Sequence, residues 1–511
     1  MSLLLSLAVL ASPAAATERA PFVTAAPGAL CATPLLLQGL LPVGPEPLPP
    51  PGAVKQQREA IEGVTQVRGS ANFAVKWGAA AAVDEAQVQV LLEGMEQAWS
   101  VQMVEMEHPE PYGTGTYLLN VYIEDTGLVW TSGGSSYELR GSGAAGYYTT
   151  DPEGHPMLVM SSYALGTADY TRAVAAHELY HAVQAGMGAY PYRDRAAWYW
   201  EATASWMAGE VFPDIPSYAD FLFGYALLPW LPLAFFDYPD TGALQEYRQY
   251  GAFILPRHLS EVAADWSVVR DSWTRPDPGG DPVLALDEAL LAYDTTVADE
   301  LAAMTARLAA WDYRDGEVYR ANVEGYGSYY PDGDRLQGEV GAAGTDGWVQ
   351  PDADQLPRAT GSNLVSIAAA AEDRTLELQL DAQGEAGSEA MWRVILVEPS
   401  STGPSYRSVE LEEGAASVLL PAGVETRWLA VTVDSQARDA DEVFAWSYRV
   451  GAVEEEPAGE DTGLPAGEGG GGEPIRACGC ASGGGPAGRS WLAVLVGLAG
   501  LAVARRGSGL G

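Results

Sequence analysis

The chain has 511 residues, of which 47% are hydrophobic, and it carries 68 acidic against 28 basic side chains, a net charge of −40. This length and apolar content provide material for two domains with sizeable cores, whereas so negative a surface argues against nucleic acid or anionic lipid as a partner. Three cysteines do not make a disulfide framework.

The N-terminal segments have the composition of export and processing regions. Residues 1–16 combine an apolar run with a small-residue end, Ala14-Ala15-Ala16, which predicts a signal peptide although basic residues before the run are missing. A buried N-terminal helix is the alternative interpretation. Residues 17–69 are rich in proline and lack a core pattern, so we expect a linker or a pro-segment.

Regular structure is predicted from Asn72 onward. Phe73, Val75 and Trp77 alternate as in a strand, and an amphipathic helix with a capping box at Asp84 and Gln87 follows. Its apolar stripe consists of Val88, Leu91, Leu92, Met95 and Trp99. Residues 117–124, 146–150 and 157–162 are three further strand candidates separated by Gly/Ser loops.

The sequence His-Glu-Leu-Tyr-His at 177–181 carries the most specific chemical signal. His177 and His181 are four residues apart, so a helix places both imidazoles on one face, where they can share a metal ion. Glu178 stands beside them as a candidate general base. Only five histidines occur in the chain, which makes a chance match rare, although two ordinary helix residues at a packed face are the alternative.

A third ligand is available in the next helical stretch, residues 195–211. Glu201 lies twenty residues beyond His181, a spacing that fits a helix, a turn and a second helix packed back on the first. It is surrounded in sequence by tryptophans and alanines, where a lone carboxylate would be costly to bury. A surface carboxylate is the alternative interpretation.

The H-E-x-x-H motif followed by Glu201-Ala202-Thr203-Ala204 resembles the gluzincins, which are the thermolysin-like zinc metallopeptidases. The local motif W-x-x-E-A-T-A-x-W resembles a group of secreted bacterial members. The resemblance implies zinc on His177, His181 and Glu201, with Glu178 as general base, and a sheet whose edge strand pairs with the peptide substrate. One departure is Ser205, where thermolysin-like enzymes often carry an Asp that orients the first His. Cys31, in the pro-segment, is either a thiolate that silences the zinc or an incidental residue.

The middle of the chain offers candidate oxyanion donors. Residues 212–236 are aromatic, apolar and interrupted by prolines, which predicts packed loops and short helices rather than a membrane span. Residues 245–263 are expected to be helical, and within them Tyr250 and His258 are candidates to stabilise the oxyanion, core or surface roles being the alternative. The acidic turn at 331–334 is too sparse in oxygens for a clear calcium loop.

The C-terminal third changes character. Seven short alternating strands between 357 and 453 predict a β-sandwich behind a zincin-like domain at 70–345, so the fold class is α+β. An acidic Gly/Pro linker, 454–474, leads to a tail at 475–511 with Cys478-Gly479-Cys480, a short apolar run and Arg505-Arg506. The tail is similar to the MYXO-CTERM sorting signal, which implies a sorting protease as partner and surface display; a plain tail anchor is the alternative.

Together these features predict an exported or surface-displayed zinc peptidase that acts on protein or peptide substrates, with neither nucleic acid nor a nucleotide cofactor as partner. Two other functions stay open. One alternative is a surface binding or adhesion protein built on an inactive zincin scaffold. The other is a metal-dependent hydrolase of non-peptide substrates.

Overall fold

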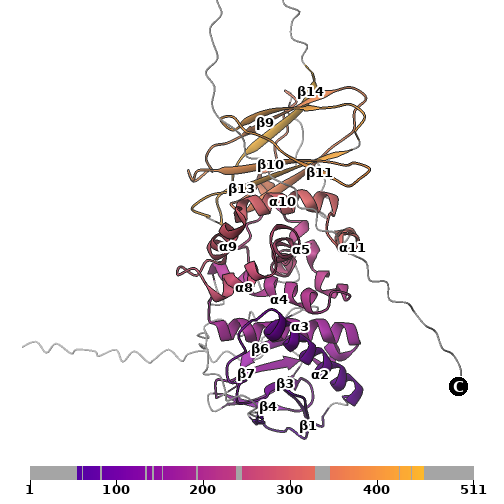
Figure 1. Ribbon diagram of the computed structural model, residues 1–511, viewed down its shortest axis with the longest axis vertical. Coiled ribbons are helices and arrows are strands. Elements are labelled where there is room, and N and C mark those ends of the chain that lie inside the picture. The colour runs from indigo at the N-terminus through magenta and orange to yellow at the C-terminus, as the bar shows by residue number, and fades with distance from the viewer. Residues whose placement is uncertain are drawn as a thin grey trace, which may run out of the picture. The chain divides into compact units, whose positions relative to one another are not determined.

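The computed structural model describes Cys31 and residues 54–453, with gaps at 60, 81–82, 133–134, 141–142, 152, 191–193, 238–243, 328–343, 345, 425 and 439. The predicted signal peptide, most of the pro-segment, the turn at 331–334, the acidic linker and the sorting tail lie outside these residues. Helices and separate sheets both occur, which confirms the α+β class (Figure 1).

The first layer is a five-stranded sheet in the order β1-β2-β3-β7-β6. Its strands are β1 (Gln66–Gly69), β2 (Phe73–Trp77), β3 (Leu119–Ile123), β6 (Gly146–Thr150) and β7 (Pro156–Met160), so the sheet begins before Asn72, where order was expected to start. Strands β2, β3 and β7 are parallel, whereas β6 is antiparallel to β7 and forms an edge. A hairpin of β4 (Val129–Ser132) and β5 (Ser135–Glu138), which the sequence did not indicate, forms a separate ribbon.

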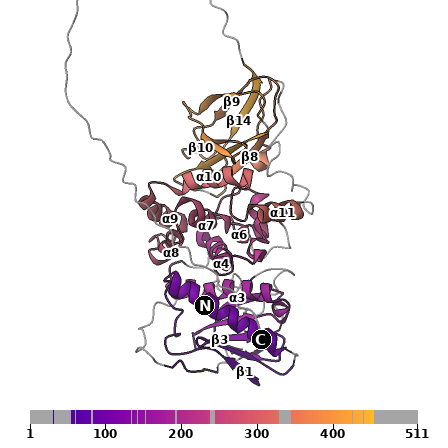
Figure 2. The same cartoon turned by 45° about the vertical axis from the view of Figure 1, so that its right-hand side comes forward.

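Helix α2 (Glu85–Trp99) connects β2 to β3 and has the predicted capping box. The Asp84 side chain accepts a hydrogen bond from Ala86 N, and Asp84 N donates one to the Gln87 side chain. The apolar stripe of α2 is buried in the main core against Phe73 and the next helix. That helix, α3 (Ala168–Met187), begins at the Thr167 cap and ends at Gly188, whose φ of 61° suits a residue without Cβ. Figures 1 and 2 show α3 between the sheet and α4 (Ala197–Val211).

The chain after α4 folds into a group of short helices. These are α5 (Leu222–Ala226), α6 (Arg248–Gly251), α7 (Ile254–His258), α8 (Ser267–Thr274), α9 (Pro282–Leu290), α10 (Val297–Ala310) and α11 (Gly316–Gly327). The helical character expected over 245–263 is confirmed, but the stretch is divided into a 3-10 turn, α6, α7 and a π turn. Pro256 lacks an amide donor, and Gly251 lies so close to α5 that a Cβ would be 2.6 Å from Phe221 O.

The seven strands expected at the C-terminal end are confirmed and form two packed antiparallel sheets, β11-β10-β13-β8 and β12-β9-β14. The strands are β8 (Gly361–Ile367), β9 (Arg374–Leu380), β10 (Met391–Glu398), β11 (Ser405–Ser408), β12 (Ala415–Leu420), β13 (Arg427–Asp434) and β14 (Trp446–Ala452). The position expected for the fourth strand, 408–412, was wrong, because β11 ends at Ser408.

The sandwich and the helices share one core. Leu364, Val397 and Ala430 on the first sheet belong to the same buried apolar cluster as α3 and α4. Arg393 on β10 pairs with Asp299 on α10 at 2.6 Å, and Arg438 pairs with Asp287 on α9 at 3.0 Å. The described residues accordingly form one compact unit. Among the described residues, no helix combines the length and apolar character that a membrane crossing requires.

Candidate metal centre

Helix α3 brings His177 and His181 together as the four-residue spacing predicts. Their Nε2 atoms are 3.1 Å apart and their rings are nearly perpendicular, with centroids 4.7 Å apart. Helix α3 is buried on almost every side, by α2, α4 and β6, so both imidazoles point into protein rather than solvent. Both side chains have 0% exposure.

Glu201 reaches the same point from α4. Its Oε2 is 3.3 Å from His177 Nε2, and its Oε1 is 3.5 Å from His181 Nε2. Trp200 stacks on the His181 ring at 6.1 Å between centroids, which fixes that ring on one side. The surface-carboxylate alternative was therefore wrong, because Glu201 is fully buried and faces both histidines.

The pKa values of His177, His181 and Glu201 depend on burial and on the charges of their neighbours in the cluster. Burial lowers the pKa of His177 to about 4. Burial also disfavours the charged form of His181, but the Glu201 carboxylate outweighs this and raises the pKa of His181. Burial favours the neutral acid of Glu201, yet the charge of His181 and hydrogen bonds from both rings lower its pKa to about 2. Glu201 is thus held as a carboxylate, the form that binds metals.

The spacing of the donor atoms fits a metal ion. Bonds of about 2.0–2.1 Å to nitrogen or oxygen in a tetrahedral zinc site place neighbouring ligand atoms roughly 3.3–3.4 Å apart. The two Nε2 atoms are 3.1 Å apart, and each lies 3.3 or 3.5 Å from a different oxygen of Glu201, which is close to this value. A fourth donor, Cys31 Sγ, completes a buried group whose ligand atoms all lie within 4.8 Å of one another. The cluster of Cys31, His177, His181 and Glu201 could therefore hold a metal ion.

Gln184 is a site residue that the sequence analysis missed. Its Oε1 is 2.7 Å from His181 Nδ1, and its Nε2 donates to Trp200 O and to Thr203 Oγ1. An acceptor at Nδ1 favours the tautomer with its proton there and leaves Nε2 free to bind a metal. The signal was its position three residues after His181, on the same helical face.

Ser205, the departure from the thermolysin-like pattern, lies on α4 and would have to orient His177. The Nδ1 of His177 and the hydroxyl of Ser205 are both buried, and neither has a hydrogen-bond partner within the described residues. Ser205 therefore does not hold His177 in the way that the Asp of thermolysin-like sites is expected to. In this cluster the histidine fixed by a side-chain amide is the second, His181.

Glu178 lies beside the cluster, under the edge strand. Gly146 of β6 packs on it so closely that a Cβ at position 146 would lie 2.9 Å from Glu178 Cγ. Cys31 Sγ is 3.4 Å from Glu178 Oε2. Glu178 is fully buried, and β6 is the edge strand that the zincin resemblance led us to expect along the cleft.

The two oxyanion candidates have different fates. Tyr250 is near the cluster: its ring centroid is 6.4 Å from that of His177, and its hydroxyl donates to Cys31 O at 3.1 Å. His258 is engaged elsewhere, with Nε2 2.9 Å from Glu300 Oε2 and Nδ1 3.1 Å from Tyr313 Oη. Because both ring nitrogens of His258 are engaged by Glu300 and Tyr313, His258 contributes to the packing of α7 on α10 rather than to the metal cluster.

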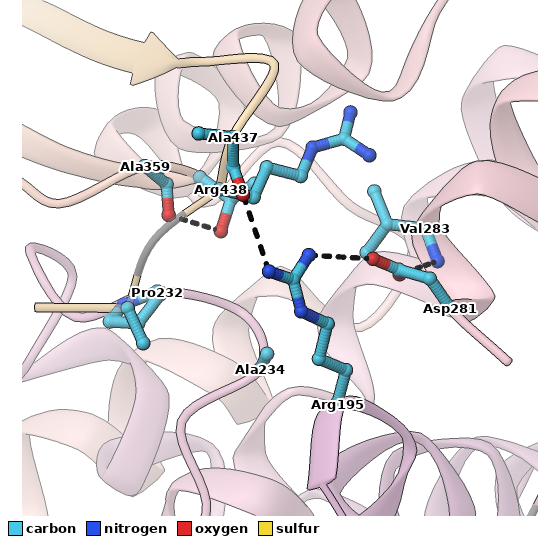
Figure 3. A pocket seen from close by; sticks show the side chains of 10 residues that line it. Arg195, Pro232, Ala234, Asp281, Val283, Ala359, Ala437 and Arg438 are labelled. Carbon is cyan, nitrogen blue, oxygen red and sulfur yellow. Dashed lines mark hydrogen bonds and ion pairs between the residues drawn. The ribbon is translucent and has the colours of Figure 1, made fainter. Parts of the chain in front are cut away.

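A separate cavity of about 500 Å³ contains none of these residues. It is lined by Arg195 before α4, Asp281 before α9 and Arg438 of the sandwich, and Figure 3 shows Arg195 reaching both Asp281 and the Ala437 carbonyl. The two guanidinium groups are thus held by neighbouring carboxylates and a carbonyl, a structural rather than a catalytic arrangement.

Comparison with known proteins identifies one family. No curated protein matches the chain. Among solved structures, a family GH115 4-O-methyl-alpha-glucuronidase, BtGH115A, with specificity for decorated arabinogalactans, aligns at 10% identity and a TM-score of 0.14, over 57% of this chain and 39% of that one. A likeness this slight carries no argument about fold or activity. A model of a family of unknown function, DUF6055, matches residues 55–442, and this chain belongs to that family.

Proposed function

We propose that this protein is an exported zinc metallopeptidase that hydrolyses peptide bonds. The observation that carries the proposal is the convergence of His177, His181 and Glu201 at ligand spacing, with Glu178 alongside. Two histidines, one glutamate and a separate carboxylate are the donor set and base of zinc hydrolases. The gluzincin resemblance supports the same assignment.

Each residue has a role that follows from its position. A bound zinc ion would supply Lewis acidity and lower the pKa of a water molecule towards neutrality. Glu178 takes the proton of the attacking water and passes it to the leaving amine. Tyr250, whose hydroxyl already donates to a peptide carbonyl, is suited to donate to the oxyanion of the tetrahedral intermediate. The edge of β6 offers backbone groups to an extended peptide.

The proposal extends to location. The signal-peptide pattern at 1–16 and the MYXO-CTERM-like tail support export, followed by display on the cell surface or release by a sorting protease. Detection of the chain in the surface or culture fraction, with its C-terminus ending near Cys478 or Cys480, is the expected result. A chain found only inside the cell with its tail intact would contradict this part.

The chemistry is tested by metal analysis and by cleavage of unfolded casein. Because Cys31 lies against the ligands, cleavage is measured in a full chain carrying Cys31→Ala. About one zinc per chain is expected with or without Glu178→Gln, while Glu178→Gln lowers cleavage by about 10²–10⁴-fold, the usual contribution of a general base. Glu93→Gln, an exposed glutamate on α2, is the matched control and leaves both quantities unchanged.

Other outcomes separate the alternatives. Zinc lost with His177→Ala but retained with Glu201→Ala would overturn the ligand set. One zinc without cleavage of any peptide would favour the binding scaffold or a hydrolase of other carbonyl compounds. An absence of metal would remove the basis of the proposal.

A further inference from the structure

We propose that Cys31 keeps this site latent: its thiolate is the fourth metal ligand, and its backbone occupies groups that a substrate would need until Cys31 is displaced or removed. This inference rests on the proposed function, because it assigns a regulation to the same metal site. It is carried by three contacts of Cys31, one from its sulfur and two from its backbone.

The sulfur contact places Cys31 among the ligands. Its Sγ lies with His177 Nε2, His181 Nε2 and a Glu201 oxygen in a group spanning no more than 4.8 Å, and all four residues have 0% exposure. The histidines and Glu201 come from two packed helices, whereas Cys31 is 146 residues before His177 in sequence. A cysteine without a role in the site would not be expected to place its sulfur beside all three ligands.

The backbone contacts are the ones that a substrate would need. Cys31 forms a parallel bridge with Gly146, the first residue of the edge strand β6. Its carbonyl oxygen accepts a hydrogen bond from the Tyr250 hydroxyl at 3.1 Å. The first residue of the edge strand and the proposed oxyanion donor are therefore both engaged by a single residue of the chain itself, and Glu178 is buried as well. A peptide cannot use these groups while Cys31 holds them.

The chemistry of the thiol suits this role. Cysteine binds zinc as a thiolate, and a catalytic zinc site keeps a fourth position open whereas a site with four protein ligands is closed. The thiol proton has an acceptor at hand, since Glu178 Oε2 is 3.4 Å from Sγ. With Cys31 as a fourth protein ligand, the position that a catalytic site keeps open would be filled.

The location of Cys31 in the sequence agrees with a removable element. His177, Glu178, His181, Glu201 and Tyr250 all fall within residues 55–442, the part of the chain that matches the family. Cys31 precedes that part, in the stretch whose composition indicates a pro-segment. Loss of the residues before 55 would leave the family's own region with three ligands and an open fourth position.

The first test detects the sulfur without relying on activity. The full chain carrying Cys478→Ser and Cys480→Ser is loaded with Co²⁺, which takes the place of zinc and gives an intense near-ultraviolet charge-transfer band when a thiolate binds it. The band is expected, and it is expected to disappear with Cys31→Ala while the visible cobalt bands remain. Bound cobalt without the charge-transfer band would overturn the ligation. Failure of both variants to bind cobalt would overturn this inference and the proposed metal site together.

The second test measures latency as cleavage of casein by full-length chains that differ only at position 31. Cys31→Ala is expected to cleave at least about tenfold faster than wild type, because a tethered ligand competes at an effective concentration in the millimolar range. Cys31→Ser, which keeps the size of the side chain and is a poorer ligand, is expected to be active as well and guards against a folding defect of the alanine variant. Equal cleavage by wild type and both variants would overturn latency and leave the proposed peptidase intact. A charge-transfer band with no cleavage in any variant would identify a closed structural metal site and overturn both proposals.

Discussion

At the residue scale, the ionisable side chains of the candidate metal centre are fully buried, so neighbouring side chains rather than water determine their charge and orientation. Glu201 stays ionised because two imidazoles face it, and His181 is turned towards the site because Gln184 accepts from its Nδ1. Gln184 is itself fixed by Trp200 O and Thr203 Oγ1, both on the helix that carries Glu201. One amide therefore links the two ligand helices and sets the tautomer of one ligand.

Replacing this amide is expected to weaken metal binding. Gln184→Leu removes the acceptor at His181 Nδ1, and a lost outer-shell partner commonly costs about 10–100-fold in metal affinity. Zinc affinity measured by competition with a chelator checks this value. Gln102→Leu is the matched control: Gln102 is also buried, and its side-chain amide donates to Ala176 O on α3 rather than to a ligand side chain. An equal loss in both variants would indicate general destabilisation instead.

A second residue-scale prediction concerns acid stability and His108. Its ring is 3% exposed, packs edge-on against Tyr180, and has no hydrogen-bond partner for either nitrogen among the residues that the structure describes. Burial, aided by the charge of Arg270, lowers the pKa of His108 to about 3, compared with 6.5 for an exposed histidine. Below pH 6.5, His108 therefore binds a proton in the unfolded chain but stays neutral in the folded chain. The free energy of unfolding consequently decreases as the pH falls from 6.5 towards 3.

His108→Phe is expected to remove this part of the acid sensitivity while keeping the aromatic contact. Between pH 7 and pH 5 the wild type should lose about 2 kcal/mol more unfolding free energy than the variant, at about 1.4 kcal/mol per pH unit below 6.5. Urea unfolding of both proteins at the two pH values measures the difference. The same loss in both would show that His108 is not a source of acid sensitivity.

At the element scale, the edge strand β6 lies against the proposed base, and its glycine makes this approach possible. A methyl group at position 146 would lie 2.9 Å from Glu178 Cγ, 3.1 Å from Glu178 Oε1 and 3.1 Å from Val159 O. Neither a backbone oxygen nor a fully buried glutamate can move away without cost. The strand and the carboxylate are therefore held in one fixed relation.

Gly146→Ala is expected to displace Glu178 and lower casein cleavage up to about 100-fold in the Cys31→Ala background, because a shift of about 1 Å in a catalytic group can cost that much. Zinc content should remain about one per chain, since no ligand is moved. Gly451→Ala on β14, where a Cβ meets no atom within 4 Å, is the matched control. Unchanged cleavage in Gly146→Ala would argue against Glu178 as the base.

At the scale of the whole molecule, the sandwich is packed on the helices through a shared core. Leu364 on β8 lies in the cluster that includes α3 and α4, whereas Leu378 on β9 lies in the separate cluster between the two sheets. Thr305 on α10 also donates to Ser362 on β8, so polar contacts accompany the apolar ones. We therefore expect the described part of the chain to unfold as one unit.

Calorimetry of the full chain tests this expectation. Leu364→Ala and Leu378→Ala each remove a buried side chain and should destabilise by about 2–5 kcal/mol. Both are expected to lower the temperature of the same single transition. Two transitions, with Leu378→Ala affecting only one of them, would show that the sandwich folds independently and that its contacts with α10 contribute little.

Helical and strand periodicity determined much of this protein from the sequence alone. The pairing of His177 with His181, the capping box of α2, the strands β2, β6 and β7 and the seven strands of the sandwich all depend on residues a few positions apart, whose relation is fixed by helix or strand geometry. Packing between distant segments decided the rest. The positions of Glu201, His258 and Cys31 relative to α3 depend on contacts between segments that are distant in sequence. No local spacing encodes those contacts. The same reason divides the stretch 245–263, because the close contact of Gly251 with α5 exists only in the folded chain.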